Sequence, residues 1–361
     1  MNINREKIVE ALRHVEDPDL KKDLVTLNMI ENISVEGNKV SFDVVLTTPA
    51  CPLKNQIRQS CIDAVHQYAD PAMEVEINMT SKVTSRRKET DAMLKDVKNI
   101  IAVGSGKGGV GKSTVAVNLA VSLAKTGAKV GLIDADIYGP SIPMMLGLIN
   151  ERPEGLDKDG KTYVLPLEKY GLKILSIGFF VDQSKALIWR GPMASMALRQ
   201  LFTDAEWGAL DYMVIDLPPG TGDIPLTLIQ DFPLTGAIIV STPQQVAIAD
   251  VRKAANMFRN EKINIPILGL VENMAYFTPP EFPEKKYFIF GEGGCSKFAG
   301  ELNIPILGQI PIVAAISDSG DSGKPLALDD LSPVAAAFDQ LAEKVAQQIA
   351  ISNSIREVFE K

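Results

Sequence analysis

The chain has 361 residues, of which 46 % are hydrophobic and 23 % are charged, the proportions of an ordinary globular protein rather than of a disordered chain. Its length favours two domains, or one large domain with an appendage. The formal net charge of -8 argues against a general nucleic-acid binder, because non-specific affinity for a polyanion comes from a surplus of Lys and Arg. The N-terminus has no apolar core, and no run of about 18 apolar residues follows it. We therefore expect a cytoplasmic protein with neither a signal peptide nor a membrane span.

The cysteines and histidines are few. Cys51, Cys61 and Cys295 form an odd and widely spaced set, which argues against a disulfide scaffold and for a reducing compartment. His14 and His66 are expected at the surface. Ligands for a self-contained transition-metal site are therefore scarce.

Residues 1–82 have the pattern of a small α+β domain. The stretch "REKIVEALRHV" predicts a helix, and the alternating "ENISVEGNKVSFDVVL" predicts a hairpin with its turn at Gly37 and Asn38. A helix near 52–68 and a strand over "MEVEINM" follow. Residues 83–97 are polar and charged with little apolar periodicity, so we expect a linker there.

Residues 98–361 predict a second, larger domain. Short apolar runs alternate with helical segments, and they read "NIIAVG", "KVGLIDAD", "YMVIDLP", "GAIIVST", "IPILGLV" and "IPILGQI". Continuous β-branched runs of this kind are typical of strands buried on both faces. The fold class that we expect is α/β, a mostly parallel sheet covered by helices on both faces, with a last helix at about 332–350.

A glycine-rich loop lies at the start of this domain, in "GSGKGGVGKST". It matches the G-x-x-x-x-G-K-[ST] pattern and falls between a predicted strand (99–104) and a predicted helix (112–125). In this pattern backbone N–H groups wrap the phosphates, Lys112 contacts the β- and γ-phosphates and Ser113 ligates Mg²⁺. The predicted nucleotide-binding residues of the loop are Gly106, Lys107, Gly108, Gly109, Val110, Gly111, Lys112, Ser113 and Thr114.

The loop carries a second lysine, Lys107, in "KGGVGKS". This form resembles the deviant phosphate loop of the dimeric ATPases that include MinD, ParA, the nitrogenase iron protein and the Mrp/ApbC proteins. The resemblance implies that Lys107 crosses a dimer interface and touches the partner's nucleotide. A cation in that place neutralises charge at the transferring phosphoryl group, so hydrolysis depends on two chains meeting. The alternative is a solvated loop lysine.

Acidic residues follow two of the predicted strands. "LIDADIYGPS" contains Asp134 and Asp136, and "VIDLPPGTGD" contains Asp216 and Gly220. The resemblance implies that Asp136 orients the attacking water, that Asp134 supports the metal shell, and that Asp216 lies near Mg²⁺ as a Walker B residue. It also implies that the Gly220 N–H reaches the γ-phosphate. An Asp at a strand end can instead be a plain helix cap.

Asn273 follows the predicted strand "IPILGLV", in "GLVENMAYF". Its amide offers both a donor and an acceptor, which matches the edge of adenine, and in the family this position selects adenine. A turn-forming Asn is the alternative. The guanine-selecting N-K-x-D pattern does not occur in this sequence. ATP with Mg²⁺ is therefore the expected ligand pair.

Six motifs occur in order, "GSGKGGVGKST", "DADIYGPSIPMMLG", "WRGPM", "DLPPGTGD", "VENMAYF" and "IFGEGG". Over about 96–345 they resemble the Mrp/ApbC proteins, proposed iron-sulfur cluster carriers. The leading "LTTPACPLKNQI" resembles the Thr-x-x-x-Cys-Pro stretch of small iron-sulfur assembly domains. The resemblance implies a homodimeric ATPase that serves iron-sulfur assembly proteins or recipient apoproteins. The acidic chain and the C-terminal "AISNSIREVFEK", with two basic residues and limited apolar area, predict neither nucleic acid nor a membrane as a partner.

One departure from the family concerns the loop between "ENM-YF" and "IFG". The family usually carries a C-x-x-C pair there, so that two chains share one [4Fe–4S] cluster. This chain reads "TPPEFPEKKYF", so that bridging site cannot be built from the loop. Cys295 could supply one thiolate per chain or be a buried structural residue.

Cys51 precedes a proline at a predicted strand-to-helix turn, where a helix N-terminus lowers the pKa of a thiol. It is the candidate ligand for metal or for cluster transfer, whereas Cys61 is expected in the core. Three interpretations stay open: a cluster carrier, a scaffold or chaperone ATPase whose client contacts the first domain or residues 274–290, and a MinD/ParA-like positioning ATPase. The last would need a basic amphipathic tail or a basic patch.

Overall fold

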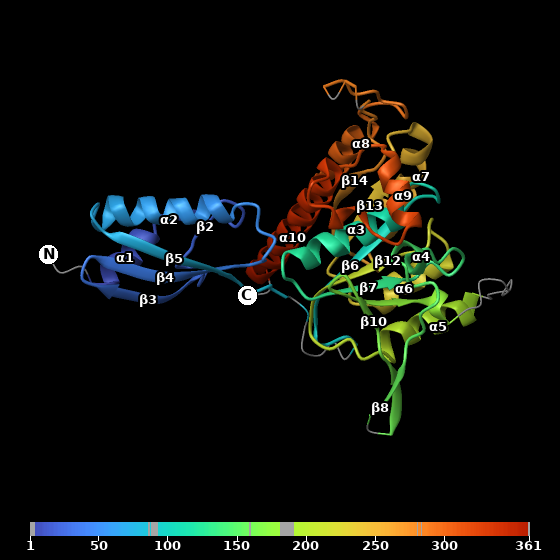
Figure 1. Cartoon of the computed structure of the whole chain (residues 1–361), viewed down its shortest axis with the longest axis horizontal. Coiled ribbons are helices and arrows are strands. Elements are labelled where there is room, and N and C mark those ends of the chain that lie inside the picture. The colour runs from blue at the N-terminus through green and yellow to red at the C-terminus, as the bar shows by residue number, and fades with distance from the viewer. Residues whose placement is uncertain are drawn as a thin grey trace. The chain divides into compact units, whose positions relative to one another are not determined.

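The computed structural model, drawn in Figure 1, describes residues 4–85, 87, 93–158, 160–180, 191–279, 281–282 and 284–359. The chain divides into two units. The smaller comprises Met1–Ser85 together with Ala346–Lys361, and the larger comprises Arg86–Val345. Among the helices of the described residues, none combines the length and apolar character that crossing a bilayer requires. Arg86 and residues 88–92 of the expected linker lie outside the described part.

The smaller unit is built on a three-stranded sheet with the order β3-β4-β5. β3 and β4 are antiparallel and close over residues 37–38, which confirms the expected hairpin, and β5 runs parallel to β4. Alternate residues of β4 are buried, the period of a strand with one face on a core. Its elements are α1 (Arg5–Leu12), β1 (Glu16–Asp17), β2 (Lys22–Asp23), β3 (Ile30–Glu36), β4 (Lys39–Leu46), α2 (Lys54–Tyr68) and β5 (Glu74–Ser81).

The larger unit is built on an eight-stranded sheet with the order β10-β11-β7-β12-β6-β13-β14-β15. All neighbouring strands are parallel except β10, which is antiparallel to β11. The strands are β6 (Val97–Ser105), β7 (Val130–Asp134), β10 (Leu167–Lys169), β11 (Leu172–Ser176), β12 (Leu210–Asp216), β13 (Gly236–Ser241), β14 (Ile267–Glu272) and β15 (Ile306–Gln309). Every residue of β7 and β13 is buried, which explains their continuous apolar runs.

Helices cover both faces of this sheet (Figure 1). One face shares a hydrophobic core with α5 (Gly191–Thr203), α6 (Asp223–Asp231), α7 (Gln245–Arg259) and α8 (Gly294–Leu302). The other face packs against α3 (Lys112–Lys125). The remaining elements are α4 (Ile142–Met145), β8 (Gly155–Lys158), β9 (Lys161–Val164), η1 (Ile177–Phe179), α9 (Ala314–Asp321), η2 (Leu326–Leu328) and α10 (Pro333–Phe359). The expected α/β class with a mostly parallel sheet is confirmed.

The sheet topology determines where a ligand can bind. β6 lies between β12 and β13, and the chain leaves β6 through α3 toward β7 on the β12 side, whereas β13 follows on the other side. In open parallel sheets ligands bind beyond the carboxyl ends of the strands at such a reversal. The loop after β6 is the glycine-rich loop, so the topology places it at that crevice.

The structure differs from the sequence-based expectation in several features, among them β10 and β11, which no expected apolar run covered. The last helix runs to Phe359 rather than to about 350, because "ISNSIREVF" contains neither Gly nor Pro to stop it. The antiparallel pair of β8 and β9 was not expected from the pattern. All four residues of β8 are exposed, so this strand carries none of the apolar alternation that marks a half-buried strand.

Candidate functional site

The glycine-rich loop leaves β6 and enters α3 through backbone that only glycine adopts easily. Gly109 has a φ of 79° and Gly111, the N-cap of α3, has a φ of 80°. A Cβ on Gly106 would lie 2.3 Å from the backbone of Asp250 and Val251, so no side chain fits there. A Cβ on Gly108 or Gly109 would meet nothing within 4 Å. The loop is thus an open cradle in front of a helix N-terminus, where anions bind.

Lys112, Ser113 and Asp216 meet at the carboxyl edge of β6 and β12. The Lys112 Nζ lies 2.6 Å from Asp216 Oδ1, and the Ser113 hydroxyl donates to Asp216 Oδ2. The same ammonium lies 3.7 Å from Asp136 Oδ2. Lys112 is 6 % exposed and Asp216 is fully buried. The structure therefore brings together a cation, a hydroxyl and two carboxylates, which are the groups that phosphate and Mg²⁺ require.

Asp134 fixes the loop that follows β7 by accepting hydrogen bonds from its backbone. Its carboxylate accepts hydrogen bonds from the Ser176 hydroxyl at 3.0 Å and from the backbone N–H groups of Asp136 and Ile142, both at 3.2 Å. Burial, and next the charge of Asp216, raise the pKa of Asp134 to about 7. Burial also raises the pKa of Asp136. Asp134 thus holds Asp136 in place near Lys112.

The structure places Gly220 and Asn273 beside the loop, which itself contains Lys107. The Gly220 N–H donates to the carbonyl of Ser105 at 3.0 Å. Asn273 Nδ2 donates to the carbonyl of Val110 at 2.8 Å. Lys107 is half-buried, and no carboxylate of the described residues lies within ion-pair distance of its ammonium. The predicted roles of these three residues toward a nucleotide stay predictions.

A cavity of about 420 Å³ lies beside the phosphate loop. Gly111, Thr114 and Asn273 contribute its polar side, and a Cβ on Gly111 would lie 2.1 Å from Asn273 Nδ2. An apolar cavity with a few polar groups suits a flat ring such as a nucleobase. Sequence reasoning missed the apolar lining, which comes from α4 and from the chain after β15: Met144, Met145, Pro311, Ile312, Val313 and Ile316. In the sequence, only the end of the predicted strand "IPILGQI" indicated that this part of the chain reaches the carboxyl edge of the sheet.

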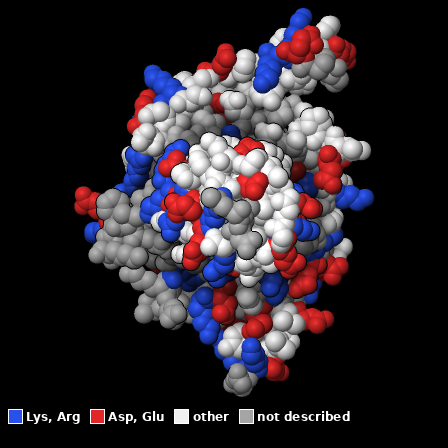
Figure 2. Space-filling view, turned by 90° about the vertical axis from the view of Figure 1, so that its left-hand side faces the viewer, with Lys and Arg blue, Asp and Glu red and all other residues white. Residues whose placement is uncertain are grey.

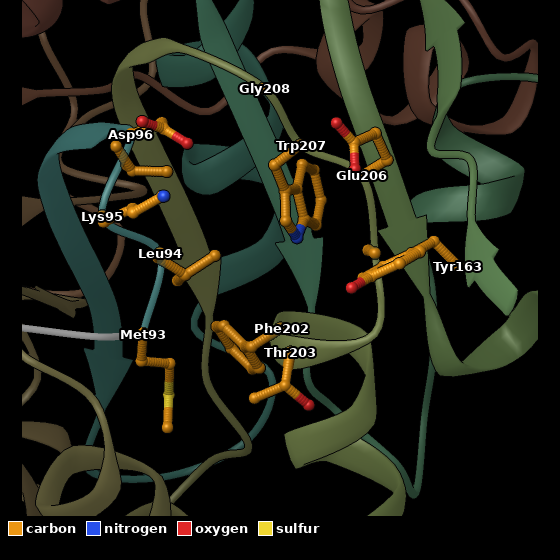
Figure 3. A pocket seen from close by; sticks show the side chains of 12 residues that line it. Met93, Leu94, Lys95, Asp96, Tyr163, Phe202, Thr203, Glu206, Trp207 and Gly208 are labelled. Carbon is orange, nitrogen blue, oxygen red and sulfur yellow. The ribbon is translucent and has the colours of Figure 1, made fainter. Parts of the chain in front are cut away.

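A second cavity, of about 460 Å³, lies at the opposite edge of the sheet, where β6 and β12 begin. Figure 3 shows the side chains of Tyr163, Phe202 and Trp207 around it. None of the residues predicted to bind nucleotide or metal lines it. The candidate site is therefore the loop at the carboxyl edge.

The three cysteines, all of which are described, have different environments. Cys51 is half-buried, whereas Cys61 and Cys295 are fully buried. Burial raises the pKa of the Cys61 thiol to about 12 and raises that of Cys295 as well. The Cys295 thiol donates to the Thr242 carbonyl at 3.6 Å. Of the three, Cys51 is thus the thiol that reagents or metal can reach.

Residues 274–290, the loop without cysteines noted in the sequence, are closed by a short bridge. Phe277 and Tyr287 exchange both backbone hydrogen bonds, at 2.8 Å each, and Lys286 lies over the Tyr276 ring. Phe282, Tyr287 and Ile289 are exposed by 50 %, 50 % and 59 %. Pro280 and Pro283 lie outside the described residues. The described part of this loop presents apolar side chains.

Comparison with known proteins yields two family matches. Residues 96–346 match the model described as NUBPL iron-transfer P-loop NTPase, and residues 5–78 match that described as iron-sulfur cluster assembly protein. An iron-sulfur cluster carrier protein of Synechocystis is 44 % identical over 353 residues, covering 97 % of this chain and 99 % of that protein. One of Deinococcus radiodurans is 45 % identical over 345 residues, covering 95 % of each.

Among solved structures, a nucleotide-binding protein of Archaeoglobus fulgidus in complex with ADP is 40 % identical with a TM-score of 0.58. The match covers 69 % of this chain and 96 % of that one. These findings confirm the family resemblance that the ordered motifs indicate.

We predict that Gly106→Ala weakens ATP binding by about tenfold or more, because the new methyl group forces the loop off the backbone of α7 at a typical overpacking cost. Titration with a fluorescent ATP analogue measures the affinity. Gly300→Ala, at an exposed position on α8 where a Cβ meets nothing within 4 Å, is the matched control and should bind like wild type. Equal affinities for all three proteins would contradict the close approach.

A second prediction concerns pH and Asp134. Its pKa rises from 3.8 to about 7 on folding, so the folded state keeps a proton that the unfolded chain releases between those values. Stability that is present near pH 4 is therefore lost as pH rises toward 7. Asp134→Asn should make this loss smaller by more than about 1 kcal/mol, measured by denaturant titration from pH 4 to 7. Asp318→Asn, at an exposed site, should follow the wild-type curve, and identical slopes for all three would refute the prediction.

Proposed function

The chain belongs to the family of NUBPL iron-transfer P-loop NTPases, and from that premise we propose that it is a homodimeric ATPase that binds iron-sulfur clusters and transfers them to recipient apoproteins. The observation that carries the proposal is the meeting of Lys112, Ser113 and Asp216 at a glycine cradle, in a chain whose first 78 residues include an iron-sulfur assembly domain. The relatives named iron-sulfur cluster carrier proteins support the cargo.

The residues present fit ATP and Mg²⁺. The cradle is open above Gly108 and Gly109, the α3 N-terminus favours negative charge, and Lys112 would turn from Asp216 to the phosphates. Ser113 and Asp216 would hold Mg²⁺, which when bound neutralises phosphate charge. Asp136, held by Asp134, would orient the attacking water. Asn273 and the adjoining apolar cavity would take the adenine.

The proposal that the chain forms a dimer rests on the position of Lys107. Its ammonium lies beyond the reach of every described carboxylate, on a loop that shows its open side to solvent. A cation that has no carboxylate partner among the described residues suits a role toward the nucleotide of a second chain. Hydrolysis of ATP to ADP and phosphate would then be slow in the monomer and faster in the dimer.

The cluster, as cargo, needs thiolates. The described part of residues 274–290 offers none, and the remaining two residues there are prolines. Cys51 is the half-buried thiol and belongs to the iron-sulfur assembly domain, so we assign the cluster contact to it. Fe–S clusters are held by such thiolates, and one Cys51 from each chain would supply two of four ligands, with a recipient or assembly protein supplying the others.

A second candidate function is an ATP-dependent scaffold for a protein client, without a cluster of its own. The exposed Phe282, Tyr287 and Ile289 favour it, because several large apolar side chains exposed on one loop are typical of a contact surface. The positioning ATPase finds less support. On the face drawn in Figure 2, Lys and Arg are interspersed with Asp and Glu, so the described part of that face presents no continuous basic patch.

We predict that Lys107→Ala reduces ATP turnover by about 10³-fold or more, the size of effect known for a cation supplied in trans, while ATP binding stays measurable. Phosphate release reports turnover and equilibrium titration reports binding. Lys297→Ala, an exposed lysine on α8, should leave both unchanged. Wild-type turnover in Lys107→Ala would rule out the role in trans.

The cargo is tested by anaerobic reconstitution with iron and sulfide, comparing wild type with Cys51→Ser. We expect visible absorption and bound iron in wild type and their loss in Cys51→Ser, because the buried thiols of Cys61 and Cys295 cannot replace Cys51. Cys61→Ser is the matched control and should keep the chromophore if it folds. Absence of a cluster in wild type, with ATPase activity intact, would favour the client-handling ATPase.

A further inference from the structure

Cys51 lines a small cavity in the smaller unit. The cavity measures about 10 Å³, and its walls include Asp17, Asp19 and Thr48. Gln347 and Ala350 of α10 complete it. The Gln347 side-chain amide donates to Asp19 Oδ1 at 2.7 Å. Cys51 is half-buried, and the wall that Gln347 and Ala350 supply leaves little space on this side of it, so wider access to the thiol requires that the α10 side of the cavity move.

The preceding part of α10 belongs to the larger unit and is fixed to the phosphate-loop helix. The Asp339 carboxylate accepts from the Ser122 hydroxyl at 2.7 Å and pairs with the Lys125 ammonium at 2.9 Å. Ser122 and Lys125 are in α3, whose first residue is Lys112. Phe338 and Leu341, the neighbours of this contact along α10, are fully buried.

Asp339 and Gln347 thus lie on one unbroken helix, eight residues or about 12 Å apart along its axis. A helix of this kind transmits a shift or a rotation between two contacts with little loss, because its backbone hydrogen bonds resist bending. The chain passes between the two units at only two points, after Ser85 and after Val345, and α10 contains the second.

We propose that α10 is a lid on the Cys51 cavity whose position follows the nucleotide. Lys112 exchanges Asp216 for phosphate when nucleotide binds, α3 adjusts, and Asp339 passes the adjustment to Gln347. The hydrogen bond from Gln347 to Asp19 breaks or forms accordingly, and the Cys51 thiol is exposed or covered. Gln347 and Asp339 are positioning residues in this device. The proposal deepens the proposed function, since it gives the ATPase control over the thiol assigned to the cluster.

The chain allows a clean readout of the lid. Of its three thiols, all described, Cys61 and Cys295 are fully buried, so alkylation of the native protein reports on Cys51. The rate of modification by iodoacetamide, followed by intact mass, measures how often the cavity opens. Cys51→Ser provides the blank.

The lid itself is tested with Gln347→Ala. Loss of one ordinary hydrogen bond raises the open population about fivefold, and the alkylation rate should rise by the same factor. Gln348→Ala, the neighbouring glutamine on the same helix, is the matched control and should react at the wild-type rate. Gln347→Glu, which places a carboxylate against Asp19, should react at least as fast as Gln347→Ala. A wild-type rate in both Gln347 variants would overturn the lid.

The link to nucleotide is tested by measuring the same rate with and without a non-hydrolysable ATP analogue and Mg²⁺. Wild type should show a change of about twofold or more, and Asp339→Asn should lose it while still binding the analogue. Asp330→Asn is the matched control, because Asp330 also pairs with Lys125, at 2.7 Å, but precedes α10. Ser122→Ala, which removes the other bond to Asp339, gives an independent second variant.

The link to nucleotide would be overturned if the analogue left the alkylation rate of wild type unchanged, or if its effect survived in both Asp339→Asn and Ser122→Ala. It would also be overturned if Asp330→Asn lost the nucleotide effect as fully as Asp339→Asn. Iron and sulfide play no part in these measurements. A chain that fails to take up a cluster but shows the lid would refute the cluster role and leave this inference standing. If Cys51 is required for cluster uptake but its alkylation rate does not change with nucleotide, the cluster role stands and the lid proposal is refuted.

Discussion

The ion pair between Lys112 and Asp216 is the contact around which the larger unit is arranged. Both side chains are buried, and removing either one would deprive the other of its nearest buried charge at a large cost. The pair exists because β12 and β6 are parallel neighbours, with Asp216 opposite Val103 in register, so that the end of β12 faces the loop after β6. Because the pair is buried, its electrostatic attraction is stronger than it would be in water.

The surrounding groups follow from that pair. Ser113 can share Asp216 because it is the next residue of the same helix, and Asp136 approaches Lys112 because Asp134 holds the loop after β7. The cavity beside the phosphate loop lies between α4, which follows the loop after β7, and the chain after β15. A cation that already sits between two carboxylates is poised to exchange them for phosphate oxygens. In the folded chain Lys112 is therefore paired through contacts that the phosphates of a ligand would replace.

Much of this could be read from the sequence because the signals are local. The phosphate loop is nine consecutive residues, the strands are continuous apolar runs, and the acidic residues follow those runs directly. What could not be read depends on long-range packing. Nothing near Gly106 indicates that Asp250 of α7 lies against it, and nothing near Asn273 indicates its bond to Val110. The exposed β8 carries no apolar alternation to reveal it. The C-terminal extension of α10 was missed because "ISNSIREVF" interrupts the apolar periodicity while containing neither Gly nor Pro to end a helix.

The Cys51 thiol and the phosphate loop belong to different units, so any coupling between them must pass through an element that the two units share. In a chain with cysteines in the 274–290 loop, both sites would belong to one unit, and a switch at the phosphates could act on thiolates directly. Here the half-buried thiol belongs to the smaller unit and the phosphate loop to the larger. Binding energy can influence a second site only through an element that differs between two states at both places. The crossing after Ser85 enters a polar stretch with little apolar periodicity, whereas the crossing after Val345 lies inside a continuous helix with side chains fixed on either side of it. Of the two crossings, the helix is the one whose described contacts can carry such a difference.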